Sequence, residues 1–178
     1  MWDMLFKRYW RVCIFKETPA NTPYSHFLLG LVSFLFLALI ILQWYITDVQ
    51  KEFKLITSIF AGLSLLCSYF IYTFVLLKVY RKTNRFAQTL TALLVSHLIV
   101  HIFAMPLLLV APIFNSTINP TFVLFFGILY LILTLVLTVW QFLITAHIYK
   151  HALEVDNLAS ILASVGLLAC NILTVSFW

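Results

Sequence analysis

Two pairs of histidines are the residues in this chain best suited to chemistry. His97 and His101 are four residues apart, as are His147 and His151, so each pair would share one face of a helix. Imidazole is the commonest metal ligand in proteins, and an ionisable group within a membrane-spanning helix often marks a functional site. A metal or haem site built on these pairs is therefore the first interpretation to weigh.

The depth of the two pairs argues against a shared site. If a spanning helix begins at Phe86, His97 lies about 16 Å and His101 about 22 Å along it, because a helix rises about 1.5 Å per residue. His147 and His151 fall at the end of the next apolar stretch, near the membrane surface. A metal would need a third ligand at matching depth, and no Asp or Glu occurs in any expected span. We therefore expect no cofactor, and interpret the histidines as neutral residues hydrogen-bonded between helices.

Three further residues within the apolar stretches are candidates for a structural or functional role. Gln141 is interpreted as a hydrogen-bonding partner between helices. Trp140, beside it, is expected to pack against lipid or another helix, with the lining of a cavity as the alternative. Pro106 lies well inside the uncharged stretch 86–111 and is expected to bend that helix. Because neighbouring groups must satisfy the carbonyl that a proline frees, we expect this helix and its bend to lie inside the bundle.

The amino-acid composition indicates that these residues lie in a membrane. The 178-residue chain is 63% apolar and only 10% charged, whereas soluble domains contain about 25% charged residues. A spanning helix needs roughly 20 predominantly apolar residues. We therefore predict an all-α, polytopic membrane protein, in which an N-terminal amphipathic segment, residues 1–25, precedes a domain of five transmembrane helices, residues 26–178. The predicted spans are residues 26–46, 55–77, 86–111, 121–147 and 157–177.

The segment before the first span has the pattern of an amphipathic helix. Apolar residues recur at helical spacing, and charged residues fall on the opposite side. The apolar positions are Trp2, Leu5, Phe6, Tyr9, Trp10 and Cys13, and the charged positions are Asp3, Lys7, Arg8 and Arg11. We expect a helix that lies in the membrane interface, with its three basic residues on anionic lipid. The alternative is a helix that docks on its own bundle.

A basic turn follows the second span, and its charges predict the topology. It contains Lys78, Arg81, Lys82 and Arg85, which we expect to contact lipid or a protein partner. With five spans, nine Lys and Arg residues lie on the side of the N-terminus: four before the first span, the four of the turn, and Lys150. The other side has two, Lys51 and Lys54. The positive-inside rule then predicts a cytoplasmic N-terminus and a C-terminus across the membrane. This asymmetry accounts for the net charge of +5, so no nucleic-acid partner is expected.

The architecture and one short proline pattern are similar to those of a known family. Five closely packed spans and the third-span sequence His101-Ile-Phe-Ala-Met-Pro106-Leu107-Leu108 resemble the Yip-domain family, small membrane proteins named for interaction with Ypt/Rab GTPases. The polar joint at residues 151–157 fits as well, and the resemblance covers roughly residues 5–178. Eukaryotic members bind Rab GTPases or shape membranes through a long cytoplasmic N-terminal region. With only about 25 residues there, this chain looks more like the short bacterial members, which are proteins of the inner membrane.

Three functions are compatible with these observations. The first is a non-enzymatic membrane protein that organises partners or lipid, through a protein partner or by self-association. The second is a transporter or channel for a small solute, acting as a homo-oligomer, with the Pro106 bend and the His97/His101 face lining the path. The third is an accessory subunit of a larger membrane complex. An enzyme is not expected, because catalysis needs positioned acid, base or nucleophilic groups and the carboxylates here all occupy loop or interface positions.

Overall fold

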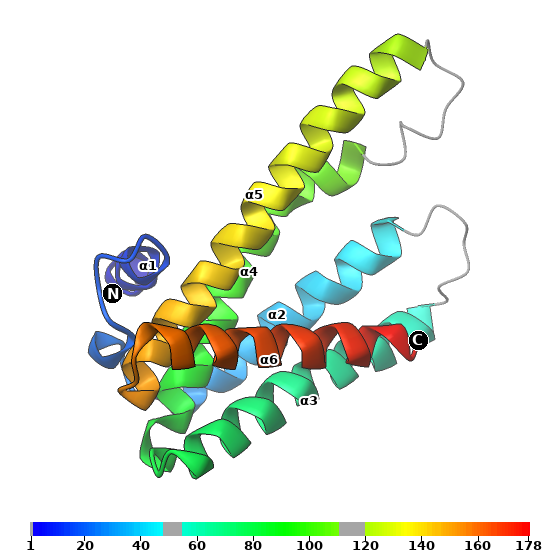
Figure 1. Ribbon diagram of the computed structural model, residues 1–178. Helices are drawn as coiled ribbons and strands as arrows, with labels where there is room; N and C mark the ends of the chain where they lie inside the picture. The colour runs from blue at the N-terminus through cyan, green and yellow to red at the C-terminus, as the bar shows by residue number, and fades with distance from the viewer. Residues whose placement is uncertain (1, 48–54, 111–119) are drawn as a thin grey trace.

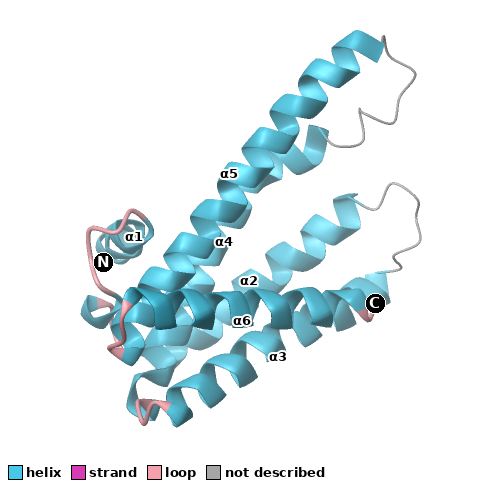
Figure 2. Ribbon diagram, viewed as in Figure 1, coloured by secondary structure: helices cyan, strands magenta, loops and turns pink. Residues whose placement is uncertain are grey.

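The chain folds into helices throughout the part that is described. The computed structural model describes residues 2–47, 55–110 and 120–178. In chain order the helices are α1 (Trp2–Cys13), η1 (Pro19–Asn21), α2 (His26–Thr47), α3 (Leu55–Val79), η2 (Thr83–Arg85), α4 (Phe86–Val110), α5 (Pro120–Leu153) and α6 (Asn157–Ser176). Within these ranges no strand is present (Figure 2). The predicted connections 48–54, with Lys51 and Lys54, and 111–119 lie outside the described residues.

Five helices, α2 to α6, are long and apolar enough to cross a membrane. The fold-class prediction of an all-α, polytopic membrane protein is therefore confirmed. The observed helices begin within one residue of the predicted spans. The largest difference is the end of α5, which continues to Leu153, whereas the prediction ended this span at residue 147. Lys150 and His151 thus belong to the helix, and the polar joint is shorter than expected.

Three helices end in the same way, at a residue in the left-handed conformation. Phe15, Arg81 and Glu154 have φ angles of 60°, 58° and 57°. In each case the next residue donates its backbone N–H back to a carbonyl five positions earlier, as in Val155 to Lys150 at 3.2 Å. This arrangement satisfies helix carbonyls that would otherwise lack a partner. It reverses the chain after α1, α3 and α5 without a glycine.

The core of the bundle forms around the first half of α4. Most side chains from Ala87 to Val100 are buried, and Leu90, Leu93 and Leu94 are fully enclosed. α2, α3 and α5 all pack against α4, and α6 lies against both α3 and α5. The prediction that the third span lies inside the bundle holds for this half of the helix.

The other ends of α4 and α5 leave the bundle together. Beyond its first half, α4 runs beside α5 and away from α2, α3 and α6 (Figure 1). We call residues 102–110 of α4 and 120–139 of α5 the α4–α5 arm. Pro106 lies in this arm and its side chain is exposed, so the expectation that the bend lies inside the bundle is wrong. The buried part of α4 ends at Val100, before the proline is reached.

One end of the molecule gathers the charged turns. α1, the turn between α3 and α4, and the joint between α5 and α6 all lie at the same end, opposite the C-terminus (Figure 1). We call this end the basic side. Hydrogen bonds connect its parts: Gln88 Nε2 of α4 donates to the carbonyls of Ala20 and Thr22, at 2.8 and 2.6 Å. The N-terminal segment is therefore fastened to the bundle there.

Candidate functional site

His97 is the centre of a hydrogen-bonded network that joins α3, α4 and α5. Its Nδ1 atom lies 2.6 Å from the hydroxyl oxygen of Tyr69 and 3.1 Å from Gln141 Nε2. Its Nε2 atom lies 2.9 Å from Thr145 Oγ1. The side chain is 2% exposed. We call Tyr69, His97, Gln141 and Thr145 the polar network.

The contacts of the polar network determine which ring nitrogen has the proton. Thr145 Oγ1 donates its hydrogen to the Gln141 carbonyl at 2.9 Å, so it can only accept from His97. His97 therefore donates through Nε2–H, and Nδ1 accepts from the Tyr69 hydroxyl and the Gln141 amide. That is a neutral imidazole with both nitrogens satisfied. The sequence-based interpretation of His97 and Gln141 as hydrogen-bonding residues between helices agrees with these contacts.

A small cavity opens beside the polar network. Its volume is about 80 Å³, and its polar lining includes His97, Gln141, Thr145, Ser164 and Asn171. Such a volume is sufficient for a few water molecules. The Ser164 hydroxyl donates to the Ser160 carbonyl at 2.9 Å, and Asn171 Oδ1 accepts from Ser68 Oγ at 2.8 Å. Much of the hydrogen-bonding capacity around the cavity is thus used within the chain.

His101 does not share the surroundings of His97. Its ring packs against Phe36, with the ring centroids 6.0 Å apart, and its backbone carbonyl accepts from Gln43 Nε2 at 2.9 Å. The His97/His101 face is therefore divided between a polar network and an aromatic contact. The two histidines do not form one ligand-binding pair.

The second histidine pair lies near the basic side. The rings of His147 and His151 are 4.5 Å apart, and His147 Nε2 donates to the carbonyl of Glu17 at 3.0 Å. His151 Nδ1 lies 2.8 Å from the His147 carbonyl. Across residues 2–47, 55–110 and 120–178, no three His, Cys, Asp or Glu side chains come together as metal ligands would.

Trp140 contacts the N-terminal helix and not the cavity. Its Nε1–H donates to the Cys13 carbonyl at 3.0 Å. Its ring lies 6.2 Å from that of Trp10 and 6.0 Å from that of Phe103, measured between centroids. The expectation that Trp140 packs against another helix agrees with this position. The structure also shows that α1 docks on its own bundle, which was the alternative interpretation of this segment.

The docked face of α1 is well covered. Tyr9, Val12 and Cys13 are buried against the bundle. Burial raises the pKa of the Tyr9 hydroxyl to about 12, and it also raises the pKa of the Cys13 thiol. Both groups are therefore neutral at pH 7. Met4 and Phe6 are exposed, but Phe6 lies toward the bundle, where it lines a pocket with Trp10 and Phe103, so Met4 is the apolar side chain left for insertion into lipid.

The three basic residues of α1 have partners within the N-terminal segment. Lys7 Nζ lies 2.9 Å from the carboxylate of Asp3. Arg8 donates to the carbonyl of Asn21 at 3.0 Å, and Arg11 to Glu17 at 3.0 Å. Because Arg8 and Arg11 hold the chain after α1 in place, they are only partly available for the lipid contact that was expected of them.

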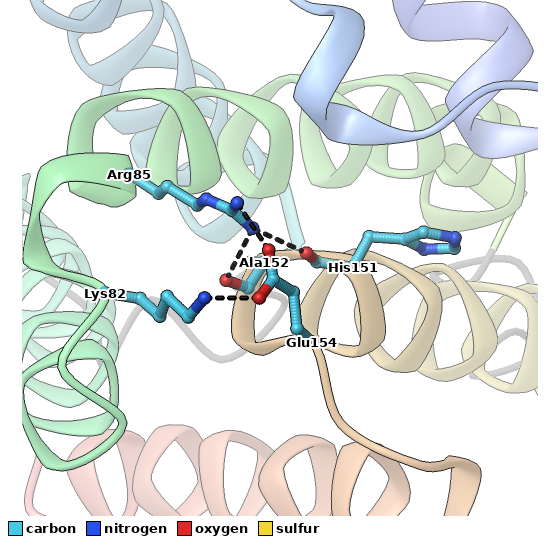
Figure 3. Close-up of polar contacts among 5 residues, drawn as sticks. All are labelled: Lys82, Arg85, His151, Ala152 and Glu154. Atoms are coloured by element: carbon cyan, nitrogen blue, oxygen red, sulfur yellow. Dashed lines mark hydrogen bonds and ion pairs between the residues drawn. The ribbon is translucent and has the colours of Figure 1, made fainter.

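The basic turn after α3 divides into two pairs of residues with different roles. Lys82 and Arg85 both contact the carboxylate of Glu154, at the joint between α5 and α6 (Figure 3). Arg85 also donates to the carbonyl of His151 at 3.2 Å. The hydrogen bonds that Glu154 accepts lower the pKa of its carboxyl group, and the bond from Lys82 has a larger effect than the bond from Arg85. The turn and the joint are thereby tied together by ionic contacts at the basic side.

The other two cations of the turn face outward. Lys78 and Arg81 are exposed. In the part of the chain that the structure describes, neither forms an ion pair. Of the four residues expected to contact lipid or a partner, these two remain free to do so.

Sequence reasoning did not identify Tyr69, Thr145 and Glu154. Thr145 follows Gln141 by four residues, so the two share a helix face, and this spacing could have indicated a common site. Glu154 is an acidic residue on the same predicted side as the basic turn, which could have suggested the ion pairs. Tyr69 gave no such signal, because α3 is apolar around its whole circumference.

Comparison with known proteins adds nothing to this geometry. No family model, curated protein or solved structure matches the chain. The resemblance to the Yip-domain family therefore stays a prediction from residues and architecture.

Proposed function

We propose that the protein is a non-enzymatic integral membrane protein of Yip-like type that organises membrane partners, protein or lipid, around its spans. A path for a polar solute would need polar groups that are free to bind it. The polar network instead satisfies His97 within the chain, through Tyr69, Gln141 and Thr145. This favours a role for the outer surfaces of the helices.

The observation that carries the proposal is the exposure of the α4–α5 arm. α5 is the least buried of the five spans. Leu124, Ile128, Leu131, Ile132 and Leu135 are all exposed, and their spacing places them on one face of the helix. Helix association in lipid depends on packing between side chains, since lipid and apolar residues attract each other equally. The exposed face of the arm, which no other helix of the described chain covers, offers this packing to a helix of another protein.

We place the protein in a bacterial inner membrane, with the basic side toward the cytoplasm. The support for the membrane is the resemblance to the short bacterial members, and the support for the orientation is the distribution of Lys and Arg along the sequence, which the positive-inside rule relates to orientation. The grouping of α1, the basic turn and the α5–α6 joint at one end is compatible with this proposal.

Photocrosslinking in native membranes tests the proposed role of the arm. A photoreactive amino acid at Leu131, 63% exposed on the arm, should give an adduct with a defined protein, identified by mass spectrometry. Phe34 on α2, 67% exposed, is the matched control outside the arm and should give lipid adducts only. A second copy of the chain on Leu131 would indicate self-association. Lipid adducts alone at both positions would contradict a protein partner at the arm.

A solute pathway is the second candidate, and the cavity beside His97 is the observation that favours it. Thr138 lines this cavity and is itself exposed, so Thr138→Leu should narrow the cavity without disturbing the core. The pathway would be supported if a small solute enters proteoliposomes that contain the unchanged protein but not those that contain this variant. Equal flux in liposomes with and without the protein would exclude that solute.

A further inference from the structure

A long groove lies on the surface between α3 and α6. Its volume is about 700 Å³, and its lining is mainly apolar. The larger side chains are Phe60, Leu63, Ile71 and Val75 from α3, and Leu173 and Phe177 from α6. From Phe60 to Val75 the groove follows α3 for about 22 Å, given a rise of about 1.5 Å per residue. This is more than half of the roughly 30 Å hydrocarbon core, so one acyl chain from one leaflet fits along it.

The polar groups in the α3–α6 groove are already used. Ser64 Oγ donates to the Phe60 carbonyl at 2.8 Å, and Thr174 Oγ1 to the Cys170 carbonyl at 2.7 Å. Ser68 Oγ lies 2.7 Å from the Leu65 carbonyl and 2.8 Å from Asn171 Oδ1. An occupant of the groove therefore finds no hydroxyl donor to bind, and must itself be apolar.

Close contact between the two helices limits the depth of the groove. Tyr72 donates its hydroxyl to the Ala163 carbonyl at 2.7 Å and lies directly over Gly166. A Cβ atom at Gly166 would come within 2.1 Å of this hydroxyl oxygen, so the contact requires a glycine there. The groove is therefore a shallow channel on the lipid-facing surface and not a passage through the bundle.

Two free cations continue the groove on the basic side. The lining residues of α3 follow one helix face up to Val75, and Lys78, three residues later, continues that face. Arg81 follows in the turn. Both are exposed and have no ion pair among the described residues, whereas Lys82, next in the chain, contacts Glu154. An apolar channel that ends at two unpaired cations complements a molecule with an apolar chain and an anionic head.

We infer that the α3–α6 groove, together with Lys78 and Arg81, binds one anionic phospholipid. One acyl chain lies in the groove, and the phosphate contacts the two cations. A membrane helix from another protein would fill the apolar channel, but it would leave the two charges without a complement. The inference rests on the proposed function, of which it specifies the lipid partner.

Native mass spectrometry of the full chain tests the inference. Phosphatidylglycerol should bind at least tenfold more tightly than phosphatidylcholine to the protein in mild detergent. The double variant Lys78→Gln/Arg81→Gln should lose roughly 10- to 30-fold in affinity for phosphatidylglycerol, from about 1 kcal/mol per cation. The matched control Lys16→Gln/Lys150→Gln removes two other exposed charges and should keep the affinity. An equal loss in the control would overturn the inference, because it would show a general effect of charge.

A photoreactive amino acid at Cys67, which is exposed in the groove, identifies the occupant directly. A phospholipid adduct with an anionic headgroup, reduced in the Lys78→Gln/Arg81→Gln variant, supports the inference. An adduct with a protein, or with phosphatidylcholine to the same extent, overturns it. The Leu131 adduct on the arm is measured in parallel. The Leu131 adduct tests the proposed protein partner at the arm, and the Cys67 adduct tests the lipid in the groove, so either proposal can fail without the other.

Discussion

Replacement of His97 by phenylalanine tests the polar network most directly. Phenylalanine has nearly the volume of histidine, so the change creates little cavity and removes the hydrogen bonds. Tyr69, Gln141 and Thr145 each lose a contact with the ring, at 2.6, 3.1 and 2.9 Å. Hydrogen bonds between membrane helices contribute about 0.6 kcal/mol each on average, so His97→Phe should lower the free energy of unfolding by about 2 kcal/mol.

The assay is reversible unfolding in mixed micelles with increasing sodium dodecyl sulfate. His101→Phe is the matched control: it lies one turn away on the same helix, and its ring packs on Phe36 without a hydrogen bond in the described structure. This control should change the free energy of unfolding by less than about 1 kcal/mol. If His97→Phe is as stable as the unchanged protein, or if both variants lose the same amount, the assignment of the network is refuted.

Three further changes test other contacts. The cationic partners of Glu154 lower the pKa of its carboxyl group. The stability that these ionic contacts contribute is therefore present above the ordinary pKa of 4.5 and is lost as the pH falls through the lower pKa of the folded protein. Glu154→Gln should remove this pH dependence when the free energy of unfolding is measured against pH. Asp156 accepts from a backbone N–H at the start of α6, so Asp156→Ala should cost about 1 kcal/mol in unfolding free energy, and Asp156→Ser should restore most of it. Gly166→Ala should displace Tyr72 and lower the temperature of thermal unfolding, whereas Gly127→Ala, with nothing within 4 Å, should not.

Contrary results would identify which of these contacts is misassigned. A pH profile unchanged in Glu154→Gln would mean that the ionic contact contributes nothing to stability. Equal losses for both Asp156 variants would remove the capping explanation. Equal thermal unfolding of both glycine variants would mean that the contact of Tyr72 with α6 adapts without cost.

The spans were predictable because they are separated by charges and prolines. Membrane helices must be long and apolar, and Lys78 to Arg85 or Glu154 to Asp156 interrupt that pattern clearly. The end of α5 was less predictable. A charged residue such as Lys150 can end an apolar span without ending the helix, since the helix can continue in the interface with its charge in water. What ends α5 is the left-handed residue Glu154, which the sequence does not reveal.

The direction in which side chains point was the part that the sequence left open. α4 is apolar on all sides, so its pattern did not distinguish the buried half, up to Val100, from the exposed arm with Pro106. For the same reason the sequence did not show that Trp140 contacts α1 while Gln141, the next residue, belongs to the polar network. Their partners belong to distant parts of the chain, and only packing determines them.

The ionic contact at the basic side also has a consequence for synthesis. Lys82 and Glu154 are 72 residues apart in the chain. At translation rates of about 5–20 residues per second, the carboxylate emerges from the ribosome about 4 to 14 s after the cation. His97 is likewise synthesised before its partners Gln141 and Thr145. The nascent protein therefore passes through a stage in which α4 is inserted with Tyr69 beside His97 Nδ1 but with no partner yet for His97 Nε2, and the network is complete only after α5 has been made.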